Sequence, residues 1–126
     1  MTEKARRKLY DISDQMAELE KKLHTIRREK RELTDRANAI QAKVVMEIGT
    51  ARDHRQRRLY RTRDLRQAVL TLRLDEDDEY QALKSRLWEL DDAERSLAIE
   101  HQRLADRRTL RMLEMGSAGA SSFGSG

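Results

Sequence analysis

The chain has 126 residues, of which 37% are hydrophobic, 4% are aromatic and 40% are charged. So few aromatic residues disfavour a globule with a large core, and the composition is typical of long helices or of a disordered chain. The absence of cysteine from the sequence excludes disulfides and thiolate metal sites. The formal net charge is +4, but residues 49–74 carry 8 Lys or Arg against 2 Asp or Glu, whereas residues 75–115 carry 7 against 12.

Apolar residues recur at alternating spacings of three and four through the first third of the chain. This heptad pattern is typical of a coiled coil, because it keeps a narrow apolar stripe on one side of a helix. The residues between are mostly good helix formers, so we predict a helix at about 5–48, with Gly49 as its left-handed cap. The predicted seam consists of Leu9, Ile12, Met16, Leu19, Leu23, Ile26, Leu33, Ala37, Ile40 and Val44, with Lys30 as its charged member.

Residues 49–77 form a connector that is too long for a simple turn between two antiparallel helices. Within it, Thr62 is the expected N-cap of a short helix with Leu65, Val69 and Leu72 on one face. The connector is therefore expected to be partly helical.

A second long helix is predicted at about 78–114, beginning in the acidic run DEDDEY, because acidic residues in a first turn interact favourably with the helix dipole. Its seam is more polar towards the C-terminus, with Glu94, His101 and Arg108 at stripe positions. The apolar seam residues are Tyr80, Leu83, Leu87, Leu90, Leu97 and Leu104.

The two long helices are similar in length and opposite in net charge, which predicts an all-α fold: an antiparallel coiled-coil hairpin spanning residues 1–115. In that alignment Lys30 lies within a turn of Glu94. The Gly- and Ser-rich residues 116–126 are expected to form a flexible tail. Apolar residues that fall off the stripes, such as Trp88 and Leu110, predict a homo-oligomer, because two helices alone bury little surface.

The stretch RDHRQRRLYRTRDLR, residues 52–66, holds seven arginines and two aspartates, and is the strongest functional signal in the sequence. Guanidinium groups bind phosphate through paired donors and keep their charge, and a tyrosine among them can stack on an exposed base. An acidic protein surface, the acidic residues 75–79 of the chain itself, or simple solvation are the alternative roles. The candidate nucleic-acid-binding residues are Arg52, Arg55, Arg57, Arg58, Tyr60, Arg61, Arg63 and Arg66.

Signatures of catalysis and of bound cofactors or metals are missing from the sequence. His24, His54 and His101 are not spaced as ligands on one helix, no phosphate-binding GxxxxGK[ST] stretch occurs, and the acidic run lacks the glycine of a calcium loop. A basic zipper is disfavoured, since five acidic residues at 75–79 separate the basic segment from the leucines that follow.

The run LRLDEDDEYQALKSRLWELD, preceded by a heptad helix and a basic connector, resembles a loose class of small coiled-coil proteins of phages and mobile elements. The shared features are Asp77, Glu79, Tyr80, Gln81 and Leu83, whereas Asp78 stands where that class usually has proline. The resemblance implies proximity to recombination functions and transfers no functional residue.

These patterns together predict a non-catalytic, sequence-independent nucleic-acid-binding accessory protein, with DNA and RNA both open as ligands. The alternative is a structural adaptor that binds only protein partners through its coiled coil. No window approaches 18 uncharged apolar residues, so we expect no membrane span and a cytoplasmic location.

Overall fold

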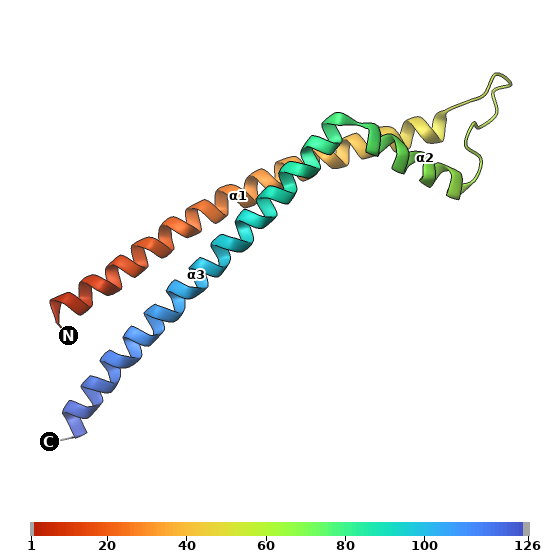
Figure 1. Cartoon of the computed structure of the whole chain (residues 1–126). Helices are drawn as coiled ribbons and strands as arrows, with labels where there is room; N and C mark the ends of the chain where they lie inside the picture. The colour runs from red at the N-terminus through yellow and green to blue at the C-terminus, as the bar shows by residue number, and fades with distance from the viewer. Residues whose placement is uncertain (1, 125–126) are drawn as a thin grey trace. The chain divides into compact units, whose positions relative to one another are not determined.

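The computed structural model describes the backbone of residues 2–124 and the side chains of residues 2–116. The described chain forms three helices: α1 (Glu3–Thr50), α2 (Arg63–Glu76) and α3 (Asp78–Gly124) (Figure 1). This confirms the all-α prediction. By contacts the chain divides into a terminal unit, Met1–Arg27 with Asp92–Gly126, and a central unit, Arg28–Asp91.

The heptad positions of α1 and α3 are the positions that lose solvent exposure. Of the predicted seam, only Arg108 is exposed. The buried seam residues are Met16, Leu19, Leu23, Ala37, Val44, Leu83, Leu90 and Leu104. Half-buried are Leu9, Ile12, Ile26, Lys30, Leu33, Ile40, Tyr80, Leu87, Glu94, Leu97 and His101.

In the terminal unit the apolar cluster contains Met16, Leu19 and Leu104, with Ile12, Leu97 and Ala105 packed against it. Two polar contacts accompany it: His101 Nε2 lies 3.0 Å from Glu20 Oε1, and Arg27 Nε lies 3.9 Å from Glu94 Oε1. From Glu20 to Arg27 the chain advances by seven residues in α1, while their partners go back by seven residues in α3, from His101 to Glu94.

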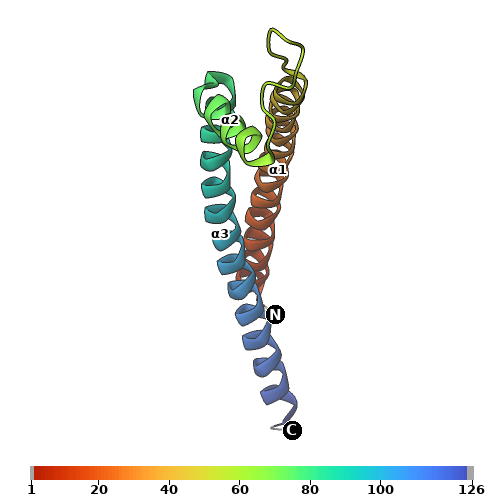
Figure 2. The same cartoon turned by 90° about the vertical axis from the view of Figure 1, so that its right-hand side faces the viewer.

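In the central unit three helices contribute to one apolar cluster. Val44 and Ile48 of α1 meet Leu70 and Leu74 of α2, and Figures 1 and 2 show α2 beside the end of α1. Ile40, Tyr60, Val69 and Tyr80 pack around these four residues. Lys30 forms an ion pair with Asp91, which lies within one turn of Glu94, the predicted neighbour of Lys30.

The end of the first helix lies close to the predicted one, but the left-handed cap predicted at Gly49 is wrong. α1 continues to Thr50, and no described glycine has a positive φ. The Thr50 hydroxyl donates to the carbonyl oxygen of Met46 at 2.7 Å, and Ile48 is buried one residue before Gly49. Burial of Ile48 in the last turn accounts for the helix continuing beyond the glycine.

The short connector helix begins where predicted. Thr62 has an extended backbone, and its Oγ1 accepts a hydrogen bond from the Leu65 N–H at 3.1 Å. The predicted apolar face is wrong in part: Val69 packs against the cluster, but Leu65 and Leu72 are exposed, and Leu70 and Leu74 are buried in their place. Contact with Val44 and Ile48 selects the pair spaced four residues apart, which one turn of helix brings together.

The start of the last helix at Asp78 is confirmed, and Asp77 caps it. Asp77 Oδ1 accepts a hydrogen bond from the Tyr80 N–H at 2.8 Å, and the Gln81 side chain donates to the Leu74 carbonyl at 2.9 Å. The predicted end near residue 114 is wrong, because α3 runs to Gly124. No proline interrupts residues 116–124, so each residue retains the N–H that a continuing helix requires. Of the predicted tail, residues 125–126 lie outside the described residues, and its flexibility stays a prediction.

Candidate nucleic-acid interface

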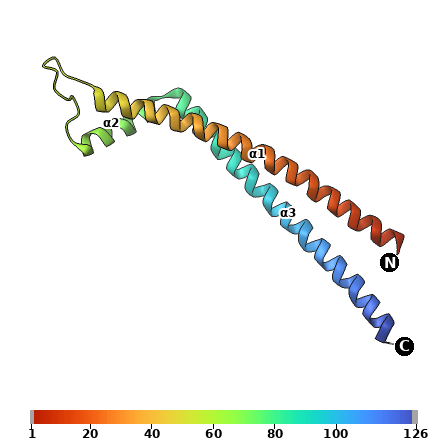
Figure 3. The same cartoon turned by 180° about the vertical axis from the view of Figure 1, so that it is seen from behind.

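The segment between α1 and α2, residues 51–62, is a closed loop that we call the arginine loop; Figure 3 shows it as a coil joining the two helices. Backbone hydrogen bonds tie its two sides together. Asp53 N–H donates to the Arg57 carbonyl at 2.8 Å, and Leu59 N–H donates to the Ala51 carbonyl at 3.0 Å. Arg52 and Arg58 face one another across an isolated antiparallel bridge.

The tip of the arginine loop is organised by the Asp53 carboxylate. Its Oδ1 accepts from the N–H groups of Arg55 at 2.8 Å and Arg57 at 3.0 Å. Gln56 has φ 62°, the left-handed conformation in which the chain reverses, and its N–H donates to the Asp53 carbonyl at 3.0 Å. The acidic residue of the loop therefore shapes the backbone, and its side chain does not neutralise a guanidinium.

The loop is joined to α2 by side-chain contacts at its second end. Arg66 Nη1 donates to the carbonyl oxygens of Tyr60 at 3.2 Å and Arg61 at 3.1 Å. The Tyr60 side chain is half-buried against the apolar cluster of Val44 and Leu70. The tyrosine predicted to stack on a base thus lies against the core, and it contributes packing that anchors the loop.

The remaining arginines of the cluster are open to solvent. Arg66 is half-buried, whereas every other arginine of the stretch is exposed. The exposed residues are Arg52, Arg55, Arg57, Arg58, Arg61 and Arg63. The structure therefore brings the predicted arginines together on one short segment, with Tyr60 and Arg66 as its internal supports.

The exposed arginines have no acidic partner among the side chains that the structure describes, residues 2–116. Some arginines on the helices are paired: Arg73 Nη2 lies 2.8 Å from Glu47 Oε2, and Arg86 hydrogen-bonds to Glu29. The hydrogen bond that Arg86 donates to Glu29, followed by the one that it donates to Glu89, raises the pKa of Arg86 above its ordinary value. Within the described side chains, residues 75–79 form no ion pair with the arginine loop, so that alternative for the cluster has no support in the fold.

A small groove that sequence analysis missed adjoins the arginine loop. It has a volume of about 180 Å³ and lies between the end of α1 and the start of α2. Its lining residues are Val45, Ile48, Arg63, Arg66, Gln67 and Leu70. The spacing of the last four predicts one face of a helix, but their approach to α1 could not be seen in the sequence.

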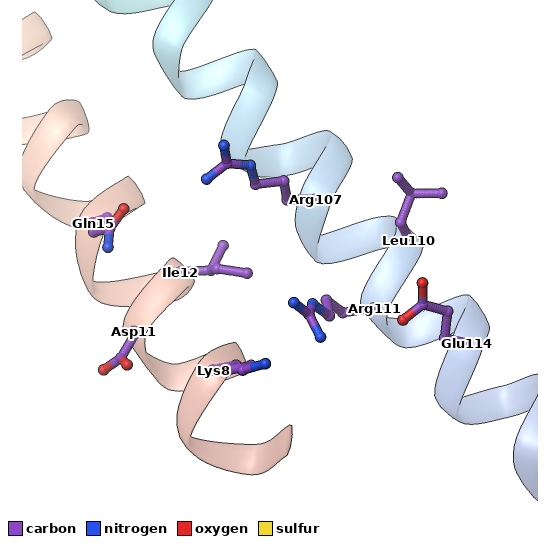
Figure 4. Close-up of a pocket in the computed structure, with 8 residues that line it drawn as sticks. All are labelled: Lys8, Asp11, Ile12, Gln15, Arg107, Leu110, Arg111 and Glu114. Carbon is purple, nitrogen blue, oxygen red and sulfur yellow. The ribbon is translucent and has the colours of Figure 1, made fainter. Parts of the chain in front are cut away.

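A larger groove of about 510 Å³ lies in the terminal unit between the start of α1 and the end of the described side chains of α3. Figure 4 shows Ile12 and Arg111 pointing into it, with Lys8 and Asp11 on the α1 side. Its lining mixes cations, carboxylates and two apolar residues, so its chemistry does not select one class of ligand.

No group of three or more metal-ligating side chains occurs in the described part of the chain. His101 pairs with Glu20 rather than with a second histidine. Over the same described residues, none of the helices combines the length and the apolar character needed to cross a bilayer.

No family model, curated protein or solved structure matches the chain. The residues of this chain are therefore the basis of its proposed function.

Proposed function

We propose that the protein is a non-catalytic accessory factor that binds nucleic acid through the phosphate backbone, without sequence specificity, by means of the arginine loop. One observation carries the proposal: five exposed arginines lie in the loop and a sixth, Arg63, begins α2, and none of the six has an acidic partner among the described side chains. DNA and RNA both present the phosphates that such a segment would bind.

Electrostatics explains why this arrangement favours a polyanion. Seven arginines against Asp53 and Asp64 leave a charge of about +5 on residues 52–66, and such a concentration of one sign of charge attracts an oppositely charged polymer. Each arginine that meets a phosphate releases condensed counterions, which supplies affinity that does not depend on base identity. The backbone hydrogen bonds around Asp53 lower the entropy lost on binding, because the loop is already ordered.

We further propose that α1 and α3 pack as an antiparallel coiled coil that carries the arginine loop. The seven-residue steps between Glu20–His101 and Arg27–Glu94 support this arrangement, as does the burial of heptad positions in both units. Self-association is part of the same proposal, since Trp88 is 72% exposed and Leu110 is 60% exposed. The cytoplasmic location and the likeness to proteins of phages and mobile elements stay predictions.

A quadruple variant tests the proposal: Arg55→Ala, Arg57→Ala, Arg58→Ala and Arg61→Ala. Binding of a fluorescent oligonucleotide is measured by anisotropy over a range of salt concentrations. The wild-type protein should bind at low salt, with affinity that falls steeply as salt rises. The slope of log K against log salt should become shallower by roughly 0.7 to 0.9 for each phosphate contact that the variant loses.

The matched control removes the same charge from the helices, with Arg28→Ala, Arg31→Ala, Arg36→Ala and Arg95→Ala, all exposed in the structure. It should retain the wild-type slope. Equal behaviour of the two quadruple variants, or no binding by the wild-type protein at low salt, would contradict the proposal.

The second candidate function is a structural adaptor that binds only protein. Exposed Trp88, Met46 and Leu72 favour it, because large apolar side chains at 60–72% exposure are suited to a partner surface. An adaptor would keep its partner when the arginine loop is neutralised, so the quadruple variant separates the two candidates.

A further inference from the structure

The groove between α1 and α2 combines an apolar floor with a cationic edge. Ile48 and Leu70 form the floor, with 3% and 9% of their surfaces exposed, and Val45 lies at the edge with 49% exposed. Arg63, Arg66 and Gln67 line the other side. The groove is therefore suited to a ligand with an apolar face and a neighbouring negative charge.

The cationic edge is held in place by the fold. Arg66 is fixed by its hydrogen bonds to the carbonyl oxygens of Tyr60 and Arg61, so its guanidinium plane is positioned before any ligand arrives. Arg63, the first residue of α2, is exposed and lies one residue beyond the Thr62 cap. A guanidinium plane in such a position can stack on a base as well as contact a phosphate.

The groove and the arginine loop are continuous along the chain. Arg61 ends the run of exposed loop arginines, and Arg63 and Arg66, only a few residues further on, line the groove. A strand whose phosphates lie on the loop thus brings its attached bases to the edge of the groove. The cavity of about 180 Å³ has room for one planar ring, and it is far too small to hold a duplex.

We propose that the groove receives one unstacked base of a single strand whose phosphates lie on the arginine loop. This inference rests on the proposed function and gives it a ligand class: single-stranded nucleic acid in preference to duplex. In a duplex both faces of each base are covered by stacking, so only the phosphates remain for the loop. Ribose and deoxyribose strands share the ring that enters, and the experiment distinguishes them.

The test uses the whole chain with single-stranded oligonucleotides of about 12 nucleotides, a length within the usual site sizes of single-strand binders. The probes are oligo-dT, oligo-rU, an abasic strand of equal length and a duplex, compared by anisotropy at one low salt concentration. Wild-type protein should bind oligo-dT or oligo-rU about tenfold more tightly than the abasic strand. The better of the two strands identifies the sugar.

The decisive variant is Val45→Phe, which replaces a small aliphatic side chain at the edge of the groove with a bulkier one. It should lower the preference for base-bearing over abasic strands from about tenfold to about one, while binding of the abasic strand stays unchanged. Met46→Phe is the control: Met46 is the adjacent residue, is 70% exposed and does not line the groove. This variant should keep the wild-type preference, and circular dichroism verifies that both proteins have the same helix content.

The outcomes separate the two proposals. Equal, salt-sensitive binding of base-bearing and abasic strands by the wild-type protein would overturn the groove inference and leave the arginine loop intact as a phosphate-binding segment. A full preference retained by Val45→Phe would also overturn the inference. Tighter binding of an acidic peptide containing Glu and Phe, with no oligonucleotide bound, would overturn both proposals in favour of the adaptor.

Discussion

The central and the terminal unit both bury apolar side chains of α1, but they cover them with different numbers of chain segments. In the central unit, residues from α1, the arginine loop, α2 and the start of α3 surround Ile48. In the terminal unit only α1 and α3 contribute to the cluster of Met16, Leu19 and Leu104. In a seam between two helices, one side of each apolar side chain stays near solvent. In the central cluster, the additional segments cover that side as well.

The central cluster adjoins the part of the chain in which positive charges are closest together. The arginines of residues 52–66 repel one another, and the free energy needed to hold them together must come from contacts at the two ends of the loop. Ile48 buries the last turn of α1, while Tyr60 and the Thr62 cap fix the entry into α2. The terminal unit contains no comparable cluster of arginines in its sequence. Its seam is interrupted by the groove beside Ile12.

The largest expected effect tests the comparison between the two clusters directly. Ile48→Ala should lower the free energy of unfolding by about 4 kcal/mol and Leu104→Ala by about 2 kcal/mol, because a fuller cluster collapses less readily around a cavity. Urea unfolding followed by circular dichroism measures both values. Equal losses would show that the two clusters are equally well enclosed.

An intermediate effect is expected at the joint between the arginine loop and α2. Thr62→Ala removes the acceptor of the Leu65 N–H and should cost about 1 kcal/mol of stability. The control is Thr71→Ala, since Thr71 donates only to the carbonyl of Gln67 within α2 and alanine is a better helix former. If both substitutions leave the urea midpoint unchanged, the cap does not hold the loop.

The smallest effect is expected from the ion pair that links α1 to α2. Arg73 and Glu47 are both about two-fifths exposed, with 2.8 Å between Nη2 and Oε2. A double-mutant cycle with Arg73→Gln and Glu47→Gln should give a coupling of only about 0.2–1 kcal/mol, which weakens as salt is added. A coupling that exceeds the Thr62 effect would mean that this ion pair contributes more to the central unit than the helix cap does.

Local patterns in the sequence predicted the elements of the fold well. The predicted heptad positions have low exposure except for Arg108, Thr62 became an N-cap, and Asp78 and Glu79 of the acidic run became part of the first turn of α3. Each of these outcomes depends on side chains within a turn or two of one another. Such interactions act regardless of what the helix later packs against.

The features that were predicted wrongly depend on contacts between segments that are distant in the chain. Gly49 stays helical, Leu65 and Leu72 face solvent, and Tyr60 turns towards the core, because Val44 and Ile48 pack against Leu70 and Leu74. The arginine loop lies between these two pairs of residues in the chain, and no local pattern in the sequence specifies its path. The groove beside Val45 was missed for the same reason, since two of its lining residues belong to α1 and four belong to α2.

The sequence by itself determined that the chain is helical, where its stripes lie, and that seven arginines occupy one short segment. The tertiary structure decided which apolar residues face the core. It also decided that the exposed loop arginines have no acidic partner among the described side chains. Helical periodicity follows from hydrogen bonds four residues apart, whereas the choice of partner depends on which distant surfaces exclude water together.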